Sequence, residues 1–118
     1  MNKSTSPALQ VALAYHEAWK NLDHASAMKV VADNVVSETP SGLIEGGAAL
    51  HKSETEFASM LTGATMVAAF GDKNTALLMY YTHTRPVPSV LSSKYFTVEN
   101  GKITGVKGLF DKSVFGGQ

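Results

Sequence analysis

The chain has 118 residues, ten basic and ten acidic side chains, no cysteine and a formal charge of zero. This length suits one domain, which we expect to span 1–118 with an ordered core at about 7–112. The balanced charge argues against nucleic-acid or membrane-surface binding, and the absence of cysteine excludes disulfides and thiolate chemistry. Because segment 1–7 lacks an apolar signal core and no run could span a membrane, we expect a soluble, cytoplasmic protein.

Two helices are predicted at the start of the chain. Ser6-Pro7 supplies an N-cap and a proline suited to the first turn, and apolar residues then recur every three or four positions over about 7–21. Asp23 is the N-cap of a second helix, which we expect to end at Asp33-Asn34. The two helices therefore meet near residue 22.

A small hairpin and a third helix follow. Segments 35–39 and 43–45 are predicted strands, because the first is β-branched and the turn between them contains Pro40 and Gly42. The third helix is predicted from Ala48 to Leu61, where apolar side chains again recur at helical spacing.

The second half has the pattern of strands. Apolar alternation predicts them at 64–70, 75–84, 90–99 and 102–110. The turn between the last two contains Asn100-Gly101, a strong hairpin signal. Helices followed mainly by an antiparallel meander predict an α+β fold in which the helices cover one face of the sheet.

The strand at 75–84 is apolar on both faces. Leu77, Met79 and Tyr81 alternate with Ala76, Leu78 and Tyr80. A sheet buried on both sides in so small a chain implies a partner subunit. We therefore expect a homodimer through the outer face of the sheet.

The stretch from Ala14 to Asp23, AYHEAWKNLD, and the later segments ETPSG at 38–42 and Glu45-Gly46 resemble the nuclear transport factor 2-like superfamily. The SnoaL-like and ketosteroid-isomerase-like branches are closest, and the resemblance runs from about Pro7 to Asp111. It implies a cystatin-like conical barrel, with three N-terminal helices packed in a curved, mainly antiparallel sheet. A deep, mostly apolar pocket is expected at the open end, and dimers through the outer sheet face are common in the superfamily.

Three positions of the steroid-isomerase branch can be placed on this chain. The tyrosine of the first helix falls at Tyr15 and is retained, but the base falls at Thr39 and the donor acid near Lys94. Glu38 stands one residue before the base position, and a single step along a strand turns a side chain to the opposite face unless a bulge intervenes. The resemblance therefore implies no steroid isomerase activity.

The candidate catalytic residues are Tyr15, Glu38, Lys94 and Asp111. Glu38 could be a base with a raised pKa or an exposed strand carboxylate, and Tyr15 a hydrogen-bond donor or a core residue. In the polyketide-cyclase branch a late-strand aspartate is the base, so Asp111 is either that base or a turn residue.

Lys94 shares a strand face with apolar residues. If it points inward, we expect it to meet Glu38, Asp111 or an anionic ligand, because a buried ammonium is costly unless it is paired or neutral. A Schiff base with a carbonyl ligand is a further possibility. In the competing register, Lys94 faces solvent and Tyr95 faces the pocket.

The predicted ligand-binding residues are large or cationic side chains of the first helix and the strands, namely Trp19, Met79, Tyr81, His83, Arg85 and Phe96. His83 and Arg85 could bind a carboxylate or enolate at the pocket mouth, or could be surface residues at a strand end. The remaining histidines lack paired spacing, so we predict no metal, and no cofactor is expected.

Three functions remain open. The first is a pocket that binds a small apolar molecule carrying a carbonyl, phenol or carboxylate. The second is a cofactor-free isomerase or cyclase, in which Glu38 or Asp111 abstracts a proton and Tyr15 with Lys94 stabilises the oxyanion. The third is a partner-binding dimer with a vestigial cavity.

Overall fold

The computed structural model describes residues 6–115, so most of the polar segment 1–7 lies outside the described residues. Three α-helices precede most of the strands: α1 (Pro7–Lys20), α2 (His24–Lys29) and α3 (Gly47–Ala58). The strands are β1 (Val31–Thr39), β2 (Gly42–Glu45), β3 (Leu61–Gly71), β4 (Thr75–Thr84), β5 (Val90–Glu99) and β6 (Lys102–Leu109), and a short 3-10 helix, Lys112–Phe115, follows.

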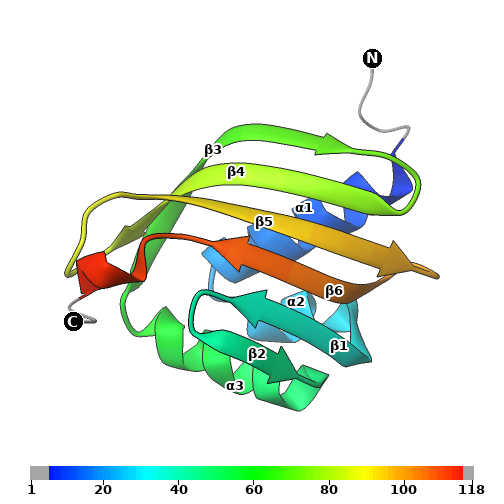
Figure 1. Cartoon of the computed structure of the whole chain (residues 1–118), viewed down its shortest axis with the longest axis horizontal. Coiled ribbons are helices and arrows are strands. Elements are labelled where there is room, and N and C mark those ends of the chain that lie inside the picture. The colour runs from blue at the N-terminus through cyan, green and yellow to red at the C-terminus, as the bar shows by residue number, and fades with distance from the viewer. Residues whose placement is uncertain (1–5, 116–118) are drawn as a thin grey trace.

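The six strands form one curved sheet in the order β2-β1-β6-β5-β4-β3. All neighbours are antiparallel except β1 and β6, which pair in parallel. Figure 1 shows α1 and α2 behind the sheet, and α3 beneath β1 and β2 at its edge. The predicted α+β fold, with three helices packed in a curved and mainly antiparallel sheet, is confirmed.

The helix starts follow the predicted caps. The Ser6 hydroxyl accepts a hydrogen bond from the Leu9 amide at 3.1 Å, and Asp23 accepts one from the Ser26 amide at 3.2 Å. Between the two helices, Leu22 has a φ of 62°, which turns the chain sharply enough for α2 to fold back beside α1.

Two predicted boundaries are wrong. The second helix ends at Lys29 rather than at Asp33-Asn34, and residues 31–34 belong to β1. The third helix ends at Ala58, and Leu61 already begins β3. In both places β-branched or apolar residues gain backbone partners in the sheet, and this tertiary pairing outweighs their local helical spacing.

Two glycine positions shape the sheet. Asn100 and Gly101 have φ values of 52° and 77° in the β5–β6 turn, which confirms the predicted hairpin. At the end of β3, Gly71 lies so close to α1 that an added Cβ would be 2.7 Å from the Ser6 Oγ and 2.8 Å from the Leu9 Cβ. The absence of a side chain at residue 71 therefore lets the start of α1 rest on the sheet.

The two faces of β4 differ in burial. Ala76, Leu78 and Tyr80 point towards the helices and are buried, whereas Leu77, Met79 and Tyr81 are 44%, 40% and 41% exposed on the outer face. In β5 the inward set includes Val90, Ser92, Phe96 and Val98, all buried. Among the described residues, no helix is long and apolar enough to cross a membrane.

Candidate functional site

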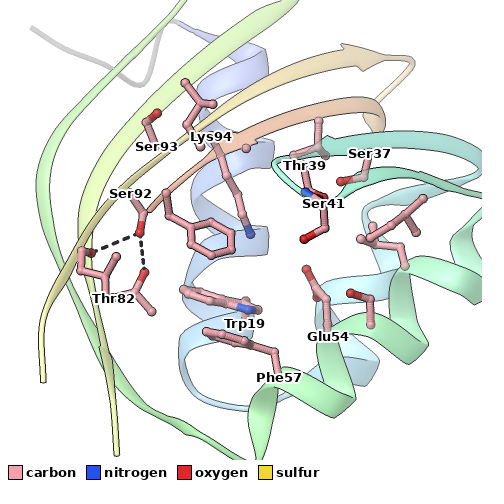
Figure 2. Close-up of a pocket in the computed structure, with 18 of the residues that line it drawn as sticks. Trp19, Ser37, Thr39, Ser41, Glu54, Phe57, Thr82, Ser92, Ser93 and Lys94 are labelled. Atoms are coloured by element: carbon pink, nitrogen blue, oxygen red, sulfur yellow. Dashed lines mark hydrogen bonds between the residues drawn. The ribbon is translucent and has the colours of Figure 1, made fainter. Parts of the chain in front are cut away.

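A cavity of about 300 Å³ lies between the inner face of the sheet and α3. Its residues come from α1, α3 and every strand except β3, and Figure 2 shows its interior. Leu43 and Leu109 line it and are 61% and 68% exposed, so the opening lies between the β1–β2 hairpin and the end of β6. The cavity is the pocket that we take as the candidate site.

Lys94 enters the pocket from β5. It lies on the same strand face as the buried Ser92 and Phe96, and Tyr95 is 40% exposed on the other side, so the register with Lys94 inward is confirmed. Its Nζ lies 4.7 Å from the centroid of the Trp19 ring and 5.4 Å from that of Tyr15. Burial lowers the pKa of the ammonium, and the nearby Glu54 offsets part of this effect.

Glu54 faces Lys94 from α3. The helix presents Leu50, Glu54 and Phe57 on one stripe, which lines the pocket. Glu54 is 7% exposed, and its Oε1 has no hydrogen-bond partner among the described residues. Burial raises the pKa of this carboxyl, while the charge of Lys94 acts in the opposite direction.

Figure 2 shows the side chains of Lys94 and Glu54 directed towards the same space, above Trp19 and Phe57. In the described part of the chain, they are the only cation and the only carboxylate that line the pocket. The two groups form no ion pair. A ligand between them could therefore contact both.

Aromatic side chains make the wall beside these two groups. Trp19 packs edge-on against Tyr80 at 5.8 Å between ring centroids, and both line the pocket. Behind them, His16 contacts Tyr80 at 4.6 Å, and burial, assisted by the charge of Lys94, lowers its pKa to about 4. Burial also raises the pKa of the Tyr80 phenol, so neither group carries a charge near neutral pH.

Hydroxyl groups occupy the remaining polar positions. Thr82 on β4 and Ser92 on β5 are joined by a hydrogen bond of 3.0 Å, and Ser92 also donates to the Val90 carbonyl at 3.2 Å. Ser37 and Thr39 line the pocket from β1, on alternate positions of the strand. The pocket is thus an apolar chamber with hydroxyls on its walls and one acid facing one amine.

Both carboxylates that were predicted to be catalytic lie outside this pocket. Glu38 is exposed on the other face of β1 and pairs with Lys107 at 2.8 Å, so the meeting of Lys94 with Glu38 does not occur. Asp111 is also exposed and accepts hydrogen bonds from the backbone and hydroxyl of Ser113. The pocket holds Glu54 in their place.

Four of the predicted ligand-binding residues also lie elsewhere. Met79 and Tyr81 are on the outer face of the sheet, because the strand phase directs Tyr80 and Thr82 inward. His83 bonds to Thr65 at 2.7 Å and to the Pro88 carbonyl at 2.8 Å, and the exposed Arg85 donates to the Ser59 carbonyl. The prediction that these four residues line the pocket is therefore wrong.

Tyr15 and Phe96 lie in the core beneath the pocket rather than on its surface. Their rings meet edge-on at 5.8 Å, and they are 1% and 0% exposed. Of the predicted residues, Lys94 and Trp19 line the pocket, while Tyr15 supports Lys94 from below.

Sequence reasoning missed Glu54 as a site residue. Its spacing from Leu50 and Phe57 places a carboxylate on the apolar stripe of a helix, and this unusual position is the feature of the sequence that could have identified Glu54. Acidic residues on a buried stripe are rare unless they have a partner or a function.

Comparisons with known proteins agree with this architecture. The chain is 42% identical to a protein from Kribbella flavida DSM 17836, with a TM-score of 0.90 over 92% of this chain and 90% of that one. An NTF2-like protein of unknown function from Cytophaga hutchinsonii is 20% identical, with a TM-score of 0.76 over 89% and 90% of the two chains. A proposed ketosteroid isomerase from Kribbella flavida is 15% identical, with a TM-score of 0.79 over 86% and 76%.

The fold is that of the nuclear transport factor 2-like proteins, as the resemblance in the sequence implies. The chain belongs to the same family as the 42% identical Kribbella flavida protein. No protein-family model and no curated protein matches the sequence.

Proposed function

We propose that this protein binds a small, mainly apolar molecule that carries a carbonyl or phenol oxygen. The observation that supports this proposal is the position of Lys94 and Glu54, which face each other across an otherwise apolar and hydroxyl-lined cavity. A cavity of about 300 Å³ is at the lower end of the range typical of ligand pockets. Its size favours a compact molecule with one or two rings over an extended lipid.

The polar pair selects the oxygen of the ligand. Lys94 can donate hydrogen bonds to a carbonyl or phenol oxygen, and burial, which raises the pKa of Glu54, favours the protonated carboxyl that can also donate. A ligand carboxylate would bring a second carboxyl group to the single amine of the pocket and compete with Glu54 for its charge, whereas a carbonyl or phenol would not. We therefore expect carbonyl compounds and phenols to bind more tightly than carboxylates of the same shape.

The fluorescence of Trp19 gives a direct test, because it is the single tryptophan of the chain and it lines the pocket. Aromatic ketones, aldehydes and phenols, each with its matched carboxylate, are titrated while Trp19 emission and the unfolding midpoint are followed. A ligand at 100 times its dissociation constant adds about 2.7 kcal/mol to the stability, which is readily detected.

A pocket-filling variant supplies the control. Ser53→Phe places a ring into the pocket from α3 and should abolish the response, whereas Thr55→Phe changes an exposed position of the same helix and should not. Equal responses from both variants, or no response to any of the compounds, would contradict the proposed pocket function.

A second candidate function is proton transfer next to a carbonyl. The buried Oε1 of Glu54, which has no partner in residues 6–115, supports it, because a base needs a carboxylate free to reach the substrate. In this proposal Glu54 replaces Glu38 and Asp111 as the base, and Lys94 stabilises the oxyanion. Deuterium uptake at the carbon beside the carbonyl of a bound ketone, lost in Glu54→Gln, would distinguish catalysis from binding alone.

We also propose that the chain forms a homodimer through the outer face of the sheet. Exposed apolar side chains from neighbouring strands lie together there, since Leu77 pairs with Tyr95 and Tyr81 with Leu91 across β4 and β5. Burying such a face removes apolar surface from water, which favours association. A dimer of this kind leaves the pocket, on the opposite face, open to ligands.

A further inference from the structure

The amine of Lys94 is placed like a nucleophile rather than like a structural cation. It reaches into the pocket, rests against the Trp19 and Tyr15 rings, and has no ion-pair or hydrogen-bond partner among the described residues that would hold it permanently charged. A lysine in apolar surroundings has a larger neutral fraction than one in water, and the neutral amine is the reactive form.

Glu54 is the acid that complements such an amine. A carboxyl and an amine that face each other can exchange one proton, so the ionic pair and the neutral pair contain the same number of protons. The apolar walls disfavour separated charges, and the two pKa shifts both act towards the neutral pair. The pocket therefore favours the neutral amine and the protonated acid more than water does.

We propose that Lys94 forms a Schiff base with small aldehydes or ketones that enter the pocket, and that Glu54 acts as the acid that releases water. This inference rests on the proposed ligand pocket and names carbonyl compounds as its covalent ligands. It adds a bond-forming role that simple binding does not require.

The steps balance as follows. The lone pair of the Lys94 nitrogen attacks the carbonyl carbon, a C–N bond forms while the C=O π bond breaks and its electron pair moves to oxygen, and a proton passes from nitrogen to that oxygen to give a carbinolamine. The protonated carboxyl of Glu54 then gives its proton to the hydroxyl, the C–O bond breaks and water leaves. The products are an iminium ion on Lys94, one water molecule and the Glu54 carboxylate.

The surroundings suit these products. The positive iminium forms near the Trp19 ring, whose centroid lies 4.7 Å from the present Nζ, and a cation is attracted to the ring face. The new carboxylate of Glu54 is its counter-charge across the pocket. Hydroxyls such as that of Ser92 line the same cavity and can hydrogen-bond to the leaving water.

Reductive trapping tests the inference on the whole chain. The protein is treated with propanal, which is small enough for a cavity of about 300 Å³, and cyanoborohydride at pH 7, and each lysine is then quantified by peptide mass spectrometry. Lys94 should become propylated faster than the exposed Lys73, because burial lowers the pKa of Lys94 and the neutral amine is the reactive form. A rate for Lys94 equal to or below that of Lys73 would overturn the proposal.

A matched pair of variants tests the acid. Loss of water limits imine formation near neutral pH, and a positioned acid accelerates such steps by about 10²- to 10⁴-fold. Glu54→Gln should therefore lower the ratio of Lys94 to Lys73 labelling by at least about tenfold, while Glu56→Gln, an exposed position on the same helix, should leave it unchanged. An unchanged ratio in Glu54→Gln would remove Glu54 from the reaction.

The outcome separates this inference from the proposed function. A ketone or phenol that alters Trp19 emission while Lys94 labels no faster than Lys73 would retain the binding pocket and overturn the Schiff base. Rapid labelling of Lys94 that Ser53→Phe abolishes would support both.

Discussion

The Nζ of Lys94 lies 4.7 Å from the centroid of the Trp19 ring, so the cation of the pocket rests on an aromatic face. The lysine comes from β5 and the tryptophan from α1, and the contact links the sheet to the first helix inside the pocket. Such a contact offsets part of the cost of desolvating the ammonium. The part of the desolvation cost that is not offset lowers the free energy of unfolding, and a mutation that removes the ammonium can measure it.

Removal of the Lys94 charge should not destabilise the protein. A methionine of similar length keeps the apolar contacts and removes a desolvated ammonium, so Lys94→Met should leave the free energy of unfolding unchanged or raise it by about 1 kcal/mol. Urea denaturation at pH 7 measures this value. Lys107→Met is the control, since it breaks an exposed, solvent-screened ion pair with Glu38 and should change the free energy of unfolding little. A loss above 1 kcal/mol in Lys94→Met would show that the ammonium is structural.

The stability of the protein should fall as the pH is lowered from 7 to 4, in part because of His16. The folded state holds this histidine neutral down to a pKa of about 4, whereas an unfolded histidine binds a proton near 6.5. Between these values the unfolded state binds more protons, so the native state loses about 3 kcal/mol from this group. Glu54 acts in the opposite sense, because its raised pKa favours proton binding by the folded state.

Variants isolate the histidine contribution from that of Glu54. Urea unfolding between pH 7 and 4 should show a shallower slope in His16→Gln than in the unchanged protein. His51→Gln, which alters an exposed histidine, is the matched control. Identical slopes in all three proteins would mean that His16 is protonated in the folded state at these pH values.

Gly71 should be intolerant of even a methyl group. In Gly71→Ala the new Cβ would meet the Ser6 Oγ at 2.7 Å and the Leu9 Cβ at 2.8 Å, so the start of α1 must move away from β3. We expect a loss of about 1 to 3 kcal/mol in the free energy of unfolding. Gly63→Ala lies on the same strand with its nearest neighbour at 3.8 Å and should be close to neutral. Thermal and urea unfolding of the two variants check this difference.

Association through the outer sheet face should give a species of twice the chain mass in sedimentation velocity at about 10 μM, a concentration at which a stable dimer persists. Tyr81→Lys introduces a charge at the middle of that face and should produce monomers. Leu22→Lys changes an equally exposed apolar residue on the turn between α1 and α2 and should leave the dimer intact. A monomer in the unchanged protein would exclude this interface.

Much of the fold could be predicted because local signals agree with the tertiary structure. The bounds of β4 and β5 were predicted to the residue, since turn residues such as Asn100-Gly101 flank regular alternation. The boundary between α2 and β1 was not, because residues 30–32 fit a helical stripe and a strand equally well. Only pairing with β6 makes residue 31 a strand position.

The site was harder to predict than the fold. On β4 both alternating sets are apolar, so the sequence could not show that Tyr80 rather than Tyr81 faces the helices. On β5, Lys94 shares its face with apolar residues such as Phe96 and Val98, which indicated an inward direction, but the sequence left open the register in which Tyr95 faces the pocket. Glu54 lies on the apolar stripe of α3, but the sequence does not show that α3 packs opposite Lys94, so Glu54 could not be assigned to the pocket.

The parallel pairing of β1 with β6 has a consequence for the order of folding. It joins Val36 to Gly105 and Glu38 to Lys107, segments almost seventy residues apart in the chain. Contacts of such large sequence separation are slow to form, because the entropy of closing the loop is lost before the contacts stabilise it. The pocket takes one wall from each of these strands, so we expect it to be completed late in folding, after the β3–β6 meander has given β1 an edge to join.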